Sequence, residues 1–257
     1  MARRALAVGA HPDDIEFMMA GALILLGQAG FELHCLVVGN GSCGSSTLSA
    51  DEIAAIRLKE ARAAAASVGA AHHGPFCPDI AIFYEPGLLA RVGSVVRQVA
   101  PEIVLTHGPD EYMEDHQNTC RLAVTGAFCR GMRNFPVDPP VAPVSEPVAV
   151  YHALPLGLKG PLNRPVTPDF FVDVTSVAKL KREMLACHRS QKEWLDVSQG
   201  MDSYLDSMDA MNRAAGKLSN RFAAAEGWIR HLNQGMSPEG FDPLAQALGP
   251  GLVSSFP

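Results

Sequence analysis

Residues able to hold a metal ion occur in two clusters of this sequence. The first is Ala-His-Pro-Asp-Asp at 10–14, and the second is His-Gly-Pro-Asp-Glu-Tyr-Met-Glu-Asp-His at 107–116. His11 and Asp14 are three residues apart, so a helical turn beginning there points both side chains the same way. One ion can then bind an imidazole nitrogen and a carboxylate oxygen. Asp13 points elsewhere and is free to accept a proton from metal-bound water, which indicates metal-assisted hydrolysis.

Each cluster also has a purely structural interpretation. Asp13 or Asp14 can be the N-cap of a strand-to-helix turn, and the second cluster can be a solvated acidic loop in which Asp115 caps a helix. Both clusters, however, directly follow a short apolar run that is typical of a buried strand. Ligands gather at the carboxyl ends of the strands in an open parallel sheet, so two such clusters can converge on one ion.

The elements that position these clusters alternate along the chain. We predict strands over 4–9, 32–38, 102–106, 147–153 and 170–174, and helices over 14–28, 50–68, 86–99, 116–132 and 176–194. Ser49 and Glu52 form a capping box before the second of these helices. The alternation predicts an α/β, Rossmann-like fold with a mostly parallel sheet and helices on both faces. In a single domain over 1–257, we expect the Pro- and Gly-rich segment 154–169 to be a substrate loop and 236–257 to be an irregular tail.

Composition narrows the class of protein. The chain has 257 residues, 47% hydrophobic and 19% charged, with a formal net charge of -6 and scattered basic residues, which argues against nucleic acid and favours a small-molecule partner. It has no apolar run long enough to span a membrane, and the apolar run near its first residues is too short for a signal peptide, so we expect none. Its six cysteines form no C-x-x-C pair. We therefore expect a cytoplasmic protein with reduced thiols and without a membrane partner. As a separate expectation, the chain associates as a homo-oligomer.

The two clusters resemble the PIG-L/LmbE family of zinc-dependent N-deacetylases, in which A-H-P-D-D follows the first strand and D-H follows a later one. Further pieces extend the resemblance over nearly the full chain. They are Arg57 and Glu60 in an R-x-x-E helix, V-D-V-T at 172–175, Lys181, S-Q at 190–191 and A-E-G at 225–227. The A-H-P-D-D motif carries most of this similarity, because each later piece is short.

The resemblance implies a role for each matching residue. His11, Asp14 and His116 would bind one zinc ion, Asp13 would be the general base, and Asp115 would support the site. Zinc lowers the pKa of bound water toward about 7, and Asp13 would take its proton as the water attacks an amide carbonyl. The implied substrate is an N-acetyl amino sugar or its conjugate. Arg57 would contact the substrate or order the site; its alternative is a surface ion pair with Glu60, one turn away.

One position departs from the family. Many members carry a histidine three residues before the second zinc histidine, and this chain has Met113 there. A thioether cannot donate a proton to the departing amine. We consider His107 and His188 as catalytic replacements, and Tyr112 as a further candidate that otherwise contacts substrate.

Met113 keeps one rival function open, a zinc-dependent hydratase or lyase that acts on an acidic small molecule. A third hypothesis is a binding protein with a relic metal site, and the intact His11, Asp13, Asp14 and His116 argue against it. Gly39, Gly41 and Gly44 fit G-x-G-x-x-G, but the predicted helix begins near residue 50, so we reject dinucleotide binding and expect this loop to lie over the metal. We expect His72 and His73 in a solvated turn.

Overall fold

The computed structural model describes residues 2–198 and 204–255, and its central feature is an eight-stranded mixed sheet in the order β3-β2-β1-β4-β5-β7-β6-β8. Parallel pairing joins the first five strands of this order, and antiparallel pairing joins β5, β7, β6 and β8. The strands are β1 (Arg4–Gly9), β2 (Glu32–Val37), β3 (Ala71–His73), β4 (Ile103–Thr106), β5 (Ala149–Ala153), β6 (Phe170–Asp173), β7 (Ala225–Arg230) and β8 (Leu252–Ser254). The predicted α/β, mostly parallel architecture is confirmed.

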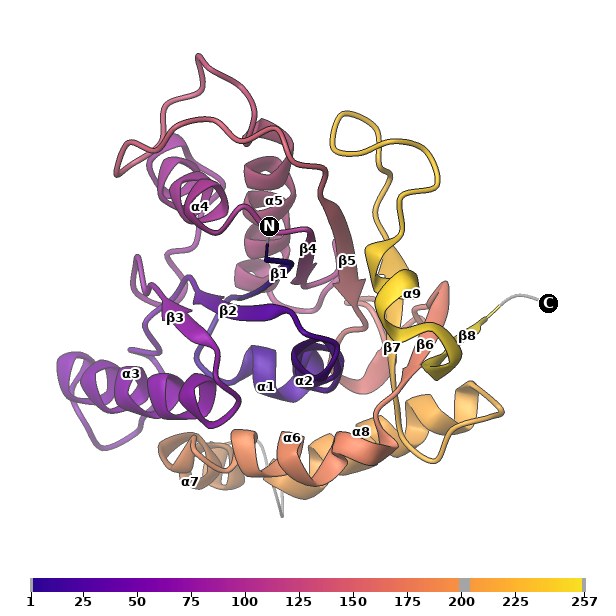
Figure 1. Ribbon diagram of the computed structural model, residues 1–257. Helices are drawn as coiled ribbons and strands as arrows, with labels where there is room; N and C mark the ends of the chain where they lie inside the picture. The colour runs from indigo at the N-terminus through magenta and orange to yellow at the C-terminus, as the bar shows by residue number, and fades with distance from the viewer. Residues whose placement is uncertain (1, 199–203, 256–257) are drawn as a thin grey trace.

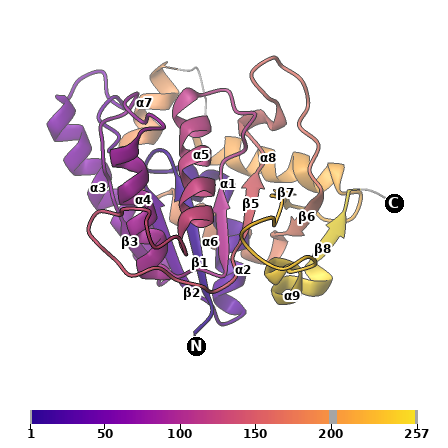
Figure 2. The same cartoon turned by 90° about the horizontal axis from the view of Figure 1, so that it is seen from above.

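Helices cover both faces of this sheet (Figures 1 and 2). On one face lie α4 (Pro86–Val99) and α5 (Glu114–Cys129). On the other lie α1 (Asp14–Met18), α2 (Ala20–Gln28) and α3 (Ala50–Ser67), and beyond them α6 (Ala178–Leu185), α7 (Arg189–Ser198) and α8 (Tyr204–Leu218). The capping box of Ser49 and Glu52 is present at the start of α3.

The alternation of side chains along β1 divides the core into two layers. Leu6 and Val8 pack with α4 and α5, whereas Ala5 and Ala7 pack with α1, α2 and the C-terminal helices. Because β1 is buried on both faces and lies between β2 and β4, its carboxyl end is fixed on all sides. The segment that leaves this end begins at Ala10, the first residue of the Ala-His-Pro-Asp-Asp cluster.

The predicted helix over 14–28 is two helices, because the chain leaves helical geometry at Met19 (φ −128°, ψ −15°). The break frees the first amides of α2, and Glu226 on β7 accepts hydrogen bonds from Gly21 (2.7 Å) and Ala22 (2.9 Å). A Cβ at Gly21 would lie 2.6 Å from Glu226 Oε1 and 2.4 Å from a Val174 methyl carbon. Glycine is therefore required for this close approach.

Lys181 neutralises this buried carboxylate, with its Nζ 2.7 Å from Glu226 and both side chains almost completely inaccessible. We expect Lys181→Met to lower the free energy of unfolding by about 3–5 kcal/mol, since it leaves a buried charge uncompensated. Urea denaturation measures this loss. The control is Lys179→Met on the same helix, whose side chain is 90% exposed and whose replacement should change stability by less than about 0.5 kcal/mol. Equal stability of the two variants would contradict the assignment.

The C-terminal half differs from expectation in several elements. The predicted helix over 176–194 is a short 3-10 turn (Thr175–Val177) followed by α6 and α7, with the chain breaking between them at 186–188. The strand β7 and the helix α8 were not predicted. The segment 236–257 is not irregular throughout, because it contains α9 (Pro243–Leu248), a 3-10 turn (Gly249–Gly251) and β8; residues 256–257 lie outside the described part. His72 and His73 lie on the edge strand β3 rather than in a turn.

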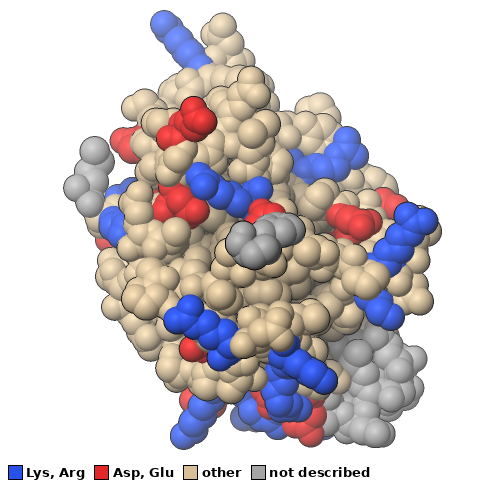
Figure 3. Space-filling model, turned by 90° about the vertical axis from the view of Figure 1, so that its right-hand side faces the viewer, with Lys and Arg blue, Asp and Glu red and all other residues tan. Residues whose placement is uncertain are grey.

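Basic side chains are dispersed on the face drawn in Figure 3, where Lys and Arg alternate with acidic and uncharged residues instead of forming a stripe. Within the described residues, no helix combines the length and apolar character needed to cross a membrane.

Candidate metal centre

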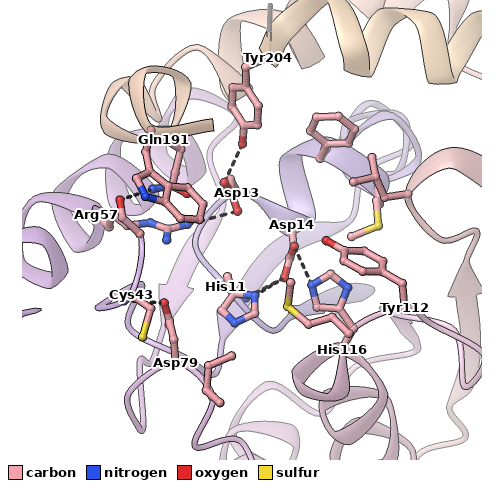
Figure 4. A pocket seen from close by; sticks show the side chains of 17 residues that line it. His11, Asp13, Asp14, Cys43, Arg57, Asp79, Tyr112, His116, Gln191 and Tyr204 are labelled. Carbon is pink, nitrogen blue, oxygen red and sulfur yellow. Dashed lines mark hydrogen bonds and ion pairs between the residues drawn. The ribbon is translucent and has the colours of Figure 1, made fainter. Parts of the chain in front are cut away.

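The carboxyl ends of β1 and β4 bring the two clusters together (Figure 4). His11 Nδ1 lies 3.6 Å from Asp14 Oδ2, and His116 Nε2 lies 3.3 Å from Asp14 Oδ1. One ligand atom of each of these residues lies within 4.8 Å of the other two, and all three residues are buried. Two imidazoles and one carboxylate are the protein donors of many catalytic zinc sites. The cluster therefore fits a divalent ion with a coordination position left for water or substrate.

Carboxylates behind the two histidines complete this arrangement. His11 Nε2 is 2.8 Å from Asp115 Oδ2, and His116 Nδ1 is 3.4 Å from Glu111 Oε2. Each histidine thus turns one nitrogen toward Asp14 and the other toward a buried acid, as metal-ligating histidines generally do. Glu111 lies within the second cluster but was not among the predicted site residues.

Electrostatics favour a cation at this point. Burial opposes the charge on His11, but its hydrogen bonds to Asp115 and Asp14 outweigh burial and raise its pKa to about 9. Burial likewise opposes charge on His116, and Asp14 and Glu111 raise its pKa to about 10. Burial favours the neutral form of Asp14, yet His116 and His107 hold its pKa well below the ordinary value. The carboxylates therefore attract positive charge into the cluster, either as protons or as a metal ion.

Asp13 lies beside the cluster with a separate set of partners. Its φ of 113° is a left-handed conformation that costs energy outside glycine, and such strain concentrates at functional sites. Tyr204 donates a hydrogen bond to Asp13 Oδ2 (2.7 Å), and Arg57 Nη2 lies 3.4 Å from Oδ1. Burial raises the pKa of Asp13 above its ordinary value, whereas Arg57 opposes the rise. A carboxylate held this way, facing the cavity, is suited to accept a proton.

The alternative interpretation of Arg57 as half of a surface ion pair is wrong. Arg57 is buried and donates hydrogen bonds to the carbonyl oxygens of Pro12 and Gly41. Glu60 instead accepts hydrogen bonds from the backbone and the hydroxyl of Ser190. Arg57 therefore fixes the turn that carries Asp13 and lines the same cavity.

The three candidate proton donors are placed differently. His107 lies beneath the cluster, stacked on His116 at 4.1 Å and 3.3 Å from Asp14 Oδ2. His188 is buried beside Glu16, with Nε2 3.3 Å from Oε1. Neither histidine is among the described residues of the cavity wall, whereas Tyr112 is. Figure 4 shows the Tyr112 hydroxyl pointing toward Asp14 and His116.

The glycine loop over 39–48 forms one wall of the cavity through Cys43 and Gly44, as expected. Asp79 fixes this loop by accepting hydrogen bonds from the backbone of Gly41 (2.6 Å) and Cys43 (3.0 Å). A Cβ at Gly44 would lie 2.5 Å from both Arg57 Nη1 and Gln191 Nε2. A side chain at this position would therefore displace the side chains of Arg57 and Gln191. The helix α3 begins at Ala50, away from the last glycine, which supports rejecting a dinucleotide site.

The cavity itself encloses about 890 Å³ including its open mouth. His11, Asp13, Asp14 and His116 lie on its polar side, and Leu156 extends into it from the predicted substrate loop. Tyr204 and Trp194 reach it from the C-terminal helices. An open cavity with apolar residues and a few convergent polar groups fits a small organic molecule.

Comparisons with known proteins identify related sequences. The sequence profile of the family described as PIG-L, GlcNAc-PI de-N-acetylase, matches residues 6–127, which include both clusters. The 4-oxalmesaconate hydratase of Pseudomonas putida is 28% identical over 198 residues, 74% of either chain. The diacetylchitobiose deacetylase of Thermococcus kodakarensis is 24% identical over 201 residues, 74% of this chain and 70% of its own.

A solved structure shows the same fold. The N,N'-diacetylchitobiose deacetylase of Pyrococcus horikoshii has a TM-score of 0.74 at 22% identity, over 93% of this chain and 88% of its own. The chain is therefore similar both to proteins named as deacetylases and to one named as a hydratase.

Proposed function

The chain belongs to the PIG-L/LmbE family, and from this premise we propose that it is a zinc-dependent hydrolase that removes an acyl group, in the simplest case acetyl, from the amine of a small molecule. The substrate class we propose is an N-acetyl amino sugar or its conjugate. One observation carries the proposal: Asp13 faces the cavity beside the cluster of His11, Asp14 and His116.

Zinc held by His11, Asp14 and His116 would supply Lewis acidity toward an amide carbonyl and make water a stronger nucleophile at neutral pH. Asp13 accepts a proton from the attacking water as the oxygen–carbon bond forms. Arg57 and Tyr204 hold the Asp13 carboxylate in the orientation that faces the cavity. When the carbon–nitrogen bond breaks, Asp13 returns the proton to the departing amine, so the site is restored without a separate acid.

We assign Tyr112 the role of hydrogen-bond donor to the substrate, which Met113 cannot fill. Its hydroxyl faces the cluster, and no hydrogen bond joins that hydroxyl to another residue in the described ranges. It can therefore donate to the carbonyl oxygen as negative charge develops there. We assign His107 and Asp115 to positioning His116 and His11, and His188 to the packing behind Asp13.

The test is release of acetate from a panel of N-acetyl amino sugars, including N-acetylglucosamine and diacetylchitobiose. We expect turnover by the zinc-loaded protein, loss of turnover after chelation, and recovery when zinc is restored. Metal binding without acetate release from any member of the panel would refute the deacetylase assignment.

A second candidate is a hydratase that adds water to an unsaturated acid. Met113 and the similarity to 4-oxalmesaconate hydratase favour it. Against it, Arg57 is the single Lys or Arg among the described cavity residues, and it already binds Pro12, Gly41 and Asp13. A substrate with several carboxylates needs more positive charge than this. Loss of absorbance of an unsaturated dicarboxylic acid, without acetate release in the panel, would establish the hydratase instead.

A further inference from the structure

The cavity has two chemically different parts. Its polar side is the metal cluster with Asp13, and its remaining wall is largely apolar. The apolar wall consists of Phe17, Met18, Ile80, Met113, Leu156 and Trp194. The amide group of a substrate fits the polar side. The apolar wall must contact a different part of the substrate.

Two polar side chains of the cavity outside the metal cluster, those of Asp79 and Gln191, already have hydrogen-bond partners. Both oxygens of Asp79 accept hydrogen bonds from the glycine loop, and Gln191 Nε2 donates to the carbonyl oxygen of Gly44 (3.1 Å). Recognition of several sugar hydroxyls needs free donors and acceptors. This wall is better suited to a group that makes no hydrogen bonds.

Ile80 provides an independent observation. Its side chain lines the cavity and is 66% exposed, and its φ is +61°. A β-branched residue in this left-handed region is a genuine outlier, and strain of this kind is kept where it serves function. The Ile80 amide donates to Asp115 Oδ2 (2.7 Å), the same oxygen that binds His11. The metal cluster therefore holds an exposed apolar side chain at the cavity wall in a costly conformation.

We propose that this wall binds an apolar group of the substrate, an aryl or alkyl group attached to the N-acyl amine. The inference rests on the proposed function and narrows its substrate class. It predicts that a simple N-acetyl amino sugar is a poor substrate compared with one that carries such a group. Burial of the apolar group against Ile80 and Trp194 supplies the preference.

The apolar group can belong to either half of the substrate, and three compounds distinguish the halves. They are N-acetylglucosamine, its phenyl glycoside, and N-octanoylglucosamine. We expect kcat/KM to be at least about tenfold higher for the phenyl glycoside or for the octanoyl amide than for N-acetylglucosamine. The compound that shows the increase identifies which half contacts the apolar wall.

Two variants locate the effect. Ile80→Asn removes the apolar side chain while tolerating a positive φ, so we expect the preference to fall by about tenfold without loss of thermal stability. Ile80→Gly provides a second variant with the same tolerance. The matched control is Phe83→Asn, because Phe83 is 61% exposed on the same loop and is not among the described cavity residues. It should keep the wild-type preference.

Binding is measured separately from turnover. Trp194 lines the cavity, and Trp228, the second tryptophan of the chain, is completely buried. We expect the phenyl glycoside to change the fluorescence of the wild type, and the Trp194→Phe variant to lose this change. Saturable binding that weakens in Ile80→Asn, with no turnover of any compound, would support the apolar site and refute the deacetylase. Equal kcat/KM for all three compounds would refute the apolar site but not the deacetylase. Absence of both the fluorescence change and the preference would also refute the apolar site.

Discussion

Replacing His116 with alanine is expected to weaken zinc binding by more than about 100-fold and to reduce turnover at limiting zinc in proportion. Loss of a group that only supports a metal ligand already costs 10–100-fold in affinity, and His116 is proposed as a ligand itself. The remaining donors, His11 and Asp14, are too few for a catalytic zinc site. Zinc content after dialysis and competition with a chromogenic chelator measure the change. His73→Ala on the edge strand β3 is the control and should retain one zinc per chain.

The number of protons released on zinc binding shows whether the weaker binding of His116→Ala arises from loss of a metal ligand. With pKa values of about 9 and about 10, His11 and His116 are both protonated in the metal-free protein at pH 7. Zinc binds neutral imidazole, so binding should release about two protons from the wild type and one from His116→Ala. The apparent affinity should therefore rise with pH between 6 and 8. Calorimetry in two buffers with different ionisation enthalpies gives the count; unchanged affinity and proton release in the variant would exclude His116 as a ligand.

The meeting of the two clusters could be predicted because strand ends are visible in the sequence. Short apolar runs before Ala10 and His107 alternate with helical patterns, which implies a parallel sheet with both carboxyl ends at one edge. The register of β1 against β4, from Ala5–Ile103 to Val8–Thr106, then brings His11 near His116. The histidine and aspartate side chains in both clusters then indicated a metal site.

The break between α1 and α2 could not be predicted in the same way. Ala20–Gln28 continues an apolar helical run, and nothing local requires a break at Met19. The freed amides are bound by Glu226, more than 200 residues away. The strand β7 that carries Glu226 was itself missed because Ala-Glu-Gly-Trp-Ile-Arg contains two charged residues and a glycine, whereas a buried strand is usually apolar.

The partners of Asp13 illustrate the same limit. Tyr204 lies 191 residues away on α8, a helix whose amphipathic pattern was available in the sequence but was not recognised. Even with α8 predicted, its packing against the metal cluster depends on tertiary contacts that periodicity does not encode. His107 and His188 were selected by residue type, and only the structure shows that they lie behind the cavity wall.

Replacing Asp13 with asparagine is expected to lower kcat by about 10²–10⁴-fold, the contribution typical of a positioned general base. Asparagine keeps the shape of the side chain and tolerates φ of 113° better than most residues, so the fold should be retained. An amide cannot accept the proton of the attacking water, although it can still accept a hydrogen bond from Tyr204. Acetate release under saturating substrate, with KM determined separately, measures the effect.

The control for this variant is Glu114→Gln, which makes the same charge change on an exposed side chain in the first turn of α5, next to Asp115. It should retain activity within about twofold, since surface substitutions have small effects. Zinc content should remain one per chain in both variants, because Asp13 is assigned to proton transfer and not to metal binding. Full activity in Asp13→Asn with normal zinc content would remove the proposed mechanism and leave the metal site intact. Loss of zinc together with activity would instead assign Asp13 to the metal.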